Sequence, residues 1–452
     1  MKVRAFRVRA LSAGTSFRYV VGEGYSCGAL RPERTRHGRA TGSDAMEANV
    51  RRLLHQRTFD PLIESPRIAK PKPYGTIERT LRYLRSLIGS LAHHTGEGMP
   101  QYEKYTTTVV GAHSVPRWYE AMDRLVGGGQ LSPADFADAQ LRASQAAILE
   151  QEIAGIDVIT GGEMHRRTHN RHSPPNAMLN HFWQKIPSFQ GETKPKPITK
   201  YDPNVFHPAA ICRGPIQDSV DLGLVDEFIA TSGFARKPVK ITMTGPHLLA
   251  AVAYDEYYGD VQKMMVDFGK LLHQNFRKLA DAGCKHLQID EPYFTASTDE
   301  QVSAAVEVIN DAIEGLPRDI HISIHICQGN YAVGPDYDGQ IGHRYFDTGR
   351  YKADLICKIG ADVYMVEHDM VPHYQGLLGD KQLGVGAVDV QAPNIETGQQ
   401  VANRIKVHDW LEPEQTLITS TCGFNHLPRH IALGKLRAMR EAQTILRGNG
   451  EA

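Results

Sequence analysis

Residues 286–327 read HLQIDEPYFTASTDEQVSAAVEVINDAIEGLPRDIHISIHIC, and this stretch decides the fold. Two short apolar runs, 286–292 and 321–327, flank a segment over 299–314 that has the hydrophobic periodicity of a helix. A strand, a helix and a second strand in this order form a parallel crossover unit. The stretch therefore predicts an α/β fold in which both strands end at the same edge of a sheet.

The same alternation extends in both directions along the chain. Further strands are predicted at 106–113, 157–164, 239–246, 361–369, 383–390 and 416–424. Further helices are predicted at 132–155, 219–231, 256–282, 349–359, 397–407 and 427–447. The segment 165–236, rich in Pro, Asn and Lys, interrupts the pattern as an irregular excursion. Eight strands separated by helices indicate a (β/α)8 TIM barrel. The alternative is a doubly wound sheet, but its glycine-rich phosphate fingerprint is missing after the first strand.

The composition is typical of a soluble globular protein. The chain has 452 residues, of which 41% are hydrophobic and 23% charged. No run of about 18 apolar residues could span a membrane. The 6 cysteines form no CxxC pair and no secretory signal precedes them, so we expect free thiols in a reducing compartment. These features predict a cytoplasmic protein whose functional cysteines are metal ligands or nucleophiles.

Residues 1–98 differ in composition from the rest of the chain. They contain 15 Arg and 3 Lys against 8 acidic residues, whereas the whole chain has a net charge of zero. Sustained periodicity is absent, apart from a helix predicted over 77–91. We interpret 1–98 as a poorly structured basic extension, or as a misassigned start upstream of Met99, and 99–452 as the barrel domain. A nucleic-acid-binding arm and a transit peptide are the alternatives, but we do not expect a nucleic-acid partner.

Polar residues gather at the predicted C-terminal ends of the strands, where barrel enzymes carry their active sites. His325 and Cys327 end the fifth strand, and their spacing of two residues places them on one face. Glu367 ends the sixth strand and Cys422 the eighth. An imidazole, two thiolates and a carboxylate form the donor set of a tetrahedral Zn2+ site, although each residue taken singly has a structural explanation. Because zinc lowers the pKa of a bound thiol, such a site is suited to the alkylation of a substrate thiol.

Residues 104–447 resemble the catalytic barrel of the cobalamin-independent methionine synthase family, including its shorter single-barrel relatives. The matching stretches, in family order, are TTTVVGAHSVPR, GGEMHRRTHNR, ITMTGP, LQIDEPYF, HISIHIC, VYMVEHD, VGAVDVQAPNIET and TSTCGFNHLPRHIALGKLRAM. The resemblance implies zinc-dependent transfer of a methyl group from a 5-methyltetrahydrofolate-type donor to the thiol of homocysteine, giving methionine. It also implies that the zinc ligands are His325, Cys327, Glu367 and Cys422.

The resemblance further assigns residues to the amino acid part of homocysteine. Glu163 and Asp290 match the residues that hold its ammonium group, and two carboxylates suit that charge. Gly111, through its backbone, and Ser114 lie where the family contacts the substrate carboxylate. The acceptor half of the site thus matches the family pattern.

The donor half departs from that pattern. Gln391 stands where the family has a histidine that assists proton delivery to the donor, and glutamine cannot act as a general acid. The nearby candidates for this role are His113, His165 and His368. The family's stacking tryptophan after the TGP motif is absent, and Tyr254 is the nearest aromatic residue. An alternative is therefore a zinc-dependent thiol alkyltransferase that uses another methyl or epoxide donor. A barrel decarboxylase of the uroporphyrinogen type, which needs no such zinc set, is a further alternative.

Overall fold

The computed structural model describes residues 6–9, 16–19, 101–166, 177–197, 206–327, 329 and 351–448. By its internal contacts the chain divides into two units, 1–95 and 96–452. In the first unit, strands β1 (Phe6–Arg9) and β2 (Ser16–Tyr19) form an antiparallel pair. The helix predicted over 77–91 and the rest of the predicted extension lie outside the described residues.

The second unit contains a closed ring of parallel strands. Six of them form one sheet in the order β11, β10, β9, β8, β7, β5. Their bounds are β5 Lys240–Thr244, β7 His286–Asp290, β8 His321–Ile326, β9 Val363–Glu367, β10 Gln382–Val388 and β11 Thr416–Ser420. The two remaining predicted strands close the ring through single parallel bridges. These bridges join Thr107 to Ile418, Thr108 to Val158 and Ile159 to Val239. The predicted (β/α)8 barrel is therefore confirmed.

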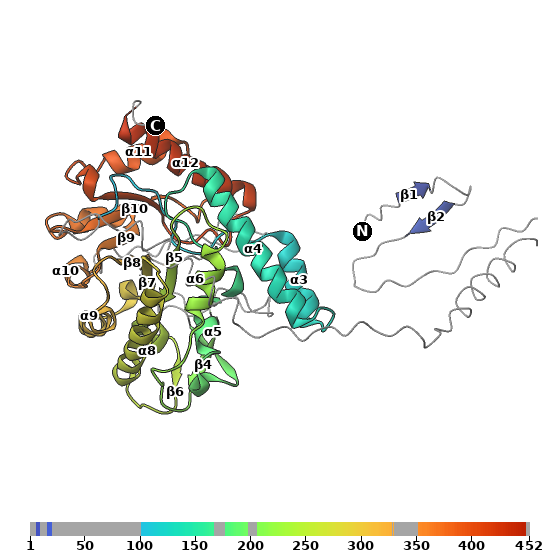
Figure 1. Cartoon of the computed structure of the whole chain (residues 1–452), viewed down its shortest axis with the longest axis horizontal. Coiled ribbons are helices and arrows are strands. Elements are labelled where there is room, and N and C mark those ends of the chain that lie inside the picture. The colour runs from blue at the N-terminus through green and yellow to red at the C-terminus, as the bar shows by residue number, and fades with distance from the viewer. Residues whose placement is uncertain are drawn as a thin grey trace, which may run out of the picture. The chain divides into compact units, whose positions relative to one another are not determined.

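Helices surround the strands (Figure 1). The helices predicted from periodicity are α4 (Pro133–Ala154), α6 (Leu224–Ser232), α8 (Val261–Asp281), α9 (Asp299–Ile313), α10 (Ala353–Ile356), α11 (Gly398–Lys406) and α12 (Arg429–Arg447). Helix α4 begins after Ser132, whose side chain accepts a hydrogen bond from the Asp135 amide. None of the described helices combines the length and apolar character needed to cross a lipid bilayer.

Several elements were not predicted. Helices α3 (Arg117–Gly127) and α7 (Pro246–Ala251) follow the first and third barrel strands. Short 3-10 helices are η1 (Met164–Arg166), η2 (Pro187–Phe189), η3 (Pro292–Ala296), η5 (His368–Tyr374) and η6 (Pro413–Gln415). The excursion contains helix α5 (Ala177–Trp183) and an antiparallel hairpin of β3 (Thr193–Pro197) and β4 (Phe206–Cys212), which β6 (Tyr254–Asp255) extends. The excursion is therefore more regular than its sequence predicted.

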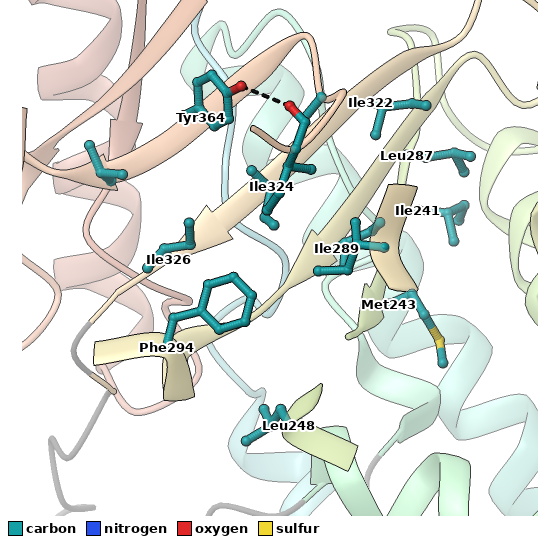
Figure 2. Packing of buried hydrophobic residues seen from close by; sticks show 14 of the residues in the cluster. Ile241, Met243, Leu248, Leu287, Ile289, Phe294, Ile322, Ile324, Ile326 and Tyr364 are labelled. Atoms are coloured by element: carbon teal, nitrogen blue, oxygen red, sulfur yellow. Dashed lines mark hydrogen bonds between the residues drawn. The ribbon is translucent and has the colours of Figure 1, made fainter. Parts of the chain in front are cut away.

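Side chains of the barrel strands alternate between two environments. Ile241 of β5, Leu287 of β7 and Ile322 of β8 lie in register and belong to the apolar layer shown in Figure 2. The positions between them carry polar side chains into the barrel interior, because successive residues of a strand point to opposite faces. One such row ends with Asp290 of β7 directly beside His325 of β8. Register thus brings a carboxylate and an imidazole together at the rim.

Polar side chains also cross the barrel interior. Lys240 is 2% exposed, and its Nζ donates to the Val109 carbonyl. Gln288 Nε2 donates to the Val110 carbonyl at 2.7 Å and to Asp290 Oδ1 at 2.7 Å. Burial lowers the pKa of Lys240 to about 7, although the carboxylates of Asp290 and Glu163 act in the opposite direction. A layer of buried hydrogen-bonding groups therefore lies in the barrel interior below the rim.

The last helix holds the start of the barrel. Arg447, at the end of α12, donates to the Lys104 carbonyl at 2.8 Å. Gln443 Nε2, one turn earlier, donates to the Tyr105 carbonyl at 2.9 Å. These bonds fasten the chain just before the first barrel strand.

Candidate metal centre

One imidazole and two thiols meet at the C-terminal rim of the barrel. His325 lies near the end of β8, Cys327 follows this strand, and Cys422 follows β11. The candidate ligand atoms of these three residues all lie within 4.8 Å of one another. The two sulfur atoms are 3.8 Å apart. A tetrahedral zinc ion with bonds of about 2.3 Å holds two sulfur atoms about 3.8 Å apart. The thiols therefore have the separation that a shared zinc ion requires.

The two thiols influence each other's ionisation. The Cys327 thiol donates a hydrogen bond to the Cys422 sulfur, which lowers the pKa of Cys422. The same bond raises the pKa of Cys327, and burial and the charge of Glu367 act in the same direction. One thiolate is therefore favoured at this pair, and the charge of a bound cation would favour the second.

A carboxylate orients the imidazole. His325 Nδ1 lies 3.0 Å from Asp290 Oδ1, and Nε2 faces the Thr421 carbonyl at 3.3 Å. Burial by itself lowers the pKa of His325, but the hydrogen bond to Asp290 and the neighbouring Cys422 sulfur raise it above its ordinary value. A carboxylate behind the imidazole is the usual arrangement for a metal-binding histidine. Asp290, predicted as a substrate contact, thus also touches a candidate ligand.

Glu367 is the predicted ligand that the structure does not bring into this group. It ends β9, the neighbour of β8, and is fully buried. The residues with ligand atoms within 4.8 Å of one another are the histidine and the two cysteines alone among the described residues. The charge of Glu367 nevertheless raises the pKa of Cys327. Glu367 therefore remains a proposed fourth ligand.

Glu163 is packed against Gly111. Its backbone has a φ of 57°, which is uncommon for a residue that carries a Cβ. Its Oε1 accepts hydrogen bonds from Thr242 Oγ1 and from Arg166 at 3.2 Å. A Cβ at position 111 would collide with the same oxygen. The glycine is therefore required for the observed placement of the carboxylate.

Ser114 ties the first rim loop to the segment before α12. Its hydroxyl donates to the Leu427 carbonyl at 2.7 Å, and the residue is 4% exposed. In this arrangement the hydroxyl has no proton to offer a carboxylate. Its contact with substrate stays a prediction.

The three histidines considered as proton donors lie outside the metal-binding group. In each case Nε2 faces a carboxylate, at 3.0 Å for His113, 3.0 Å for His165 and 2.6 Å for His368. The partners are Glu150, Glu227 and Asp369, respectively. The structure thus gives each of them a carboxylate partner, and a role in proton transfer stays a prediction.

Gln391 is linked to the metal-binding group through one backbone unit. Its Nε2 donates to the Gly329 carbonyl at 2.7 Å, and the Gly329 amide lies 3.3 Å from Cys327 Sγ. Gln391 is 5% exposed. The carboxamide therefore supports the backbone that contacts a candidate ligand.

Tyr254 lies in β6, in the sheet that β6 forms with β3 and β4. Its hydroxyl donates to the Pro195 carbonyl at 2.7 Å, and Lys196 Nζ lies 5.1 Å from the ring centroid. One face of the ring is therefore covered by a cation of the β3–β4 hairpin.

Three buried polar residues of the barrel and its rim were not predicted from the sequence. Arg166 lies three residues after Glu163 in the stretch GGEMHRRTHNR. Gln288 lies inside LQIDEPYF, and Lys240 directly precedes ITMTGP. Their position in the matching stretches was the available signal, but only the structure shows their contacts. The five described cysteines are free, as predicted, and Cys27 lies outside the described residues.

Comparisons with known proteins agree with the barrel fold. Residues 105–444 match the family described as "Cobalamin-independent synthase, Catalytic domain". The chain is 30% identical over 344 residues to a methionine synthase of Sulfurisphaera tokodaii, covering 75% of this chain and 92% of that protein. It is 32% identical over 348 residues to a methionine synthase of Thermococcus kodakarensis, covering 75% and 93%. A solved B12-independent methionine synthase from Shewanella sp. W3-18-1, in complex with selenomethionine, has a TM-score of 0.63 at 22% identity and covers 76% of this chain and 98% of that one.

Proposed function

The chain belongs to the cobalamin-independent methionine synthase family, and we propose that it is an S-methyltransferase that methylates the thiol of homocysteine to give methionine. The observation that carries the proposal is the meeting of His325, Cys327 and Cys422 at one rim of the barrel. The names of the relatives support the same reaction. So does the ligand of the Shewanella protein, because selenomethionine is the selenium analogue of the product.

We further propose that a zinc ion is held by His325, Cys327, Glu367 and Cys422. One nitrogen, two sulfurs and one carboxylate oxygen form a donor set that suits zinc. The 3.8 Å between the two sulfur atoms fits such an ion. When bound, zinc would lower the pKa of a substrate thiol that joins it, so that the thiolate is present at neutral pH.

The remaining residues would place the two substrates. Glu163 and Asp290 are proposed to hold the ammonium group of homocysteine. The thiolate sulfur attacks the methyl carbon, a carbon–sulfur bond forms, and the bond between the methyl group and the leaving atom of the donor breaks. The leaving group keeps that electron pair. Holding the two substrates in a reactive orientation can lower the activation free energy by up to roughly 7–11 kcal/mol.

The methyl donor is proposed to be of the 5-methyltetrahydrofolate type. One observation favours a second candidate, a zinc-dependent thiol alkyltransferase with another methyl or epoxide donor. Gln391 holds Gly329 beside Cys327, and its carboxamide cannot act as a general acid toward a leaving group. Incubation of the purified chain with homocysteine and each donor class, followed by mass analysis of the products, separates the two candidates.

Cys422→Ser tests the metal centre. The wild-type chain is expected to bind about one zinc ion, as four-ligand sites do. Removal of a residue behind a metal ligand typically lowers metal affinity roughly 10–100-fold. Because Cys422 is a proposed ligand itself, the variant is expected to lose more zinc affinity than that, and to lose methyl transfer as well. Zinc content by atomic absorption and methionine formation are the two measurements.

Cys284→Ser is the matched control for this experiment. Cys284 is buried just before β7, at the other end of the barrel from the rim, and its thiol donates to the His286 carbonyl. It is expected to keep both zinc and turnover. A wild-type chain without zinc, or a Cys422→Ser variant with unaltered zinc and turnover, would refute the proposal.

A further inference from the structure

We propose that Arg166 and Glu227 are positioning residues that make the site specific for a thiol carrying an ammonium group. The inference deepens the proposed function, since it rests on homocysteine as substrate and on Glu163 as the residue that meets its ammonium group. Arg166 and Glu227 act through Glu163, so neither needs to touch the substrate.

Glu163 is held in a conformation that it would not adopt freely. Its φ of 57° lies in the left-handed region, and the preceding Gly162 also has a positive φ of 72°. Such a backbone persists where the surroundings enforce it. The carboxylate rests on Gly111, where any Cβ would collide with Oε1. The structure therefore fixes both the backbone and the carboxylate of Glu163 before a substrate arrives.

The two carboxylate oxygens of Glu163 have different surroundings. Thr242 Oγ1 and Arg166 both donate to Oε1. No donor reaches Oε2 in the part of the chain that the structure describes, and the side chain keeps 16% of its surface exposed. Two fixed donors on one oxygen leave the other oriented toward an incoming cation.

Arg166 is itself held from several sides. It is 2% exposed, and its NH2 group donates to the Thr242 carbonyl at 2.6 Å and to both oxygens of Glu227 at 3.2 Å. Its guanidinium carbon lies 5.3 Å from the ring centroid of Phe182. Burial by itself would raise the pKa of Glu227, but Arg166 and then His165 lower it. Glu227 therefore stays ionised and fixes the guanidinium beside Glu163.

The charges of this network favour one class of substrate. Glu163 and Glu227 are negative and Arg166 is positive, so these three groups carry one excess negative charge in a largely buried place whenever His165, whose Nε2 lies 3.0 Å from Glu227, is neutral. An uncompensated buried charge is costly, and a substrate ammonium group would neutralise it. A thiol without an ammonium group leaves the charge unpaired. The network thus both attracts homocysteine and rejects its des-amino analogue.

The test compares homocysteine with 4-mercaptobutyrate, which keeps the thiol and the carboxylate and lacks the ammonium group. Binding of each thiol to the zinc-loaded chain is measured by calorimetry and kcat/KM by methyl transfer, at pH 8. In the wild type we expect a preference for homocysteine. In Arg166→Met the Glu163 carboxylate loses a donor that fixes its orientation, and in Glu227→Gln the network loses its excess negative charge, so in both variants we expect this preference to fall roughly tenfold or more. Zinc content and affinity for 4-mercaptobutyrate should not change.

Two further variants complete the experiment. Arg166→Lys keeps the charge without the forked geometry and should restore part of the preference. Arg447→Met removes an arginine at the opposite end of the barrel, where it binds the Lys104 carbonyl, and should leave the preference intact. Glu227→Gln changes charge at nearly constant size, so it decides the matter if Arg166→Met does not fold.

Three results would overturn the inference. One is an unchanged preference in Arg166→Met and Glu227→Gln, and another is an equal loss for both thiols, which would mark a purely structural role. The third is a wild type that binds both thiols equally well. A wild type that prefers homocysteine, loses this preference in the variants and yet makes no methionine would refute the proposed function while supporting the inference.

Discussion

Gly111 acts on the site by having no side chain. The carboxylate of Glu163 occupies the space that a Cβ would fill, and Thr160 Oγ1 donates to the Gly111 carbonyl from the next rim segment. Position 111 thus sets where a neighbouring acid can lie. Single residues of this rim work largely through such contacts with one another.

Gly111→Ala is expected to raise the KM for homocysteine at least tenfold and to leave zinc content unchanged, because the new methyl group displaces Glu163. Overpacking of this kind also costs about 1–3 kcal/mol of stability. Steady-state kinetics and chemical denaturation provide the two measurements. Gly360→Ala is the control, since a Cβ there meets its neighbours at 3.6 Å, an ordinary contact. An unaltered KM in Gly111→Ala would show that Glu163 does not contact the substrate.

Gln391→Ala is expected to weaken zinc binding roughly 10–100-fold, as loss of a group behind a ligand commonly does. The carboxamide holds the Gly329 carbonyl, and the Gly329 amide contacts Cys327 Sγ. Gln391→Glu should weaken binding at least as much, because a carboxylate would face the carbonyl oxygen. Competition with a chelator measures the affinity. Intact zinc affinity combined with lost methyl transfer would instead assign Gln391 to the methyl donor.

Part of the candidate metal centre could be predicted from the spacing of residues along one strand. His325 and Cys327 share a face because the alternation of β8 continues to the residue after the strand, and Cys422 was predicted from the order of strands around a barrel. Pairwise contacts were not predictable in the same way. The bond between His325 and Asp290 depends on the register of two strands, and the hydroxyl of Ser114 depends on a carbonyl 313 positions away. Only the fold brings such partners together.

Strand β5 carries the amine of Lys240 into the barrel interior. Lys240 Nζ contacts the Val109 carbonyl and, at 3.7 Å, Met365 Sδ. Neither partner carries a charge, and burial lowers the pKa of Lys240 from 10.5 to about 7. The unfolded chain therefore binds this proton up to a higher pH than the folded chain does.

Lys240→Met is expected to change the pH dependence of stability. Between pH 7 and 10.5 the unfolded wild type binds more protons at this site, so Lys240 contributes an increase of the free energy of unfolding with pH. The variant lacks this contribution. The difference in free energy of unfolding between wild type and Lys240→Met should therefore change by up to about 1.4 kcal/mol per pH unit. Urea denaturation of both proteins from pH 7 to pH 10 measures it. Parallel pH profiles would show that Lys240 is not neutralised on folding.

Elements were predictable where a local pattern repeats. The amphipathic period of α8 and the apolar runs of β7 and β8 are visible in the sequence, and the structure contains all three. Strand β3 reads TKPKP, and two prolines in five residues argue against a strand. It is a strand because β4 pairs with it. Such pairing with a distant segment cannot be predicted from the local sequence.

At the scale of the whole molecule, the chain divides at residues 95 and 96, and the family match begins at 105. Removal of 1–98 is therefore expected to leave zinc content and methyl transfer within about twofold of the full chain, since a domain with its own core folds alone. Full-length and shortened chains are compared by metal analysis, thermal unfolding and the transfer assay. Loss of transfer with retained zinc would give the basic segment a part in the reaction.

The hydrogen bonds from Arg447 of α12 to the Lys104 carbonyl can form only late in synthesis of the chain. The two partners are 343 positions apart, so a ribosome must finish nearly the entire domain before they can meet. At about 5–20 residues per second, this interval lasts roughly twenty seconds to a minute. For most of that time, until Ile418 is made, Thr107 has no β11 neighbour, and an unpaired edge invites association with other nascent chains. Ring closure is thus a late event in synthesis, and the nascent chain is most vulnerable to aggregation just before β11 emerges.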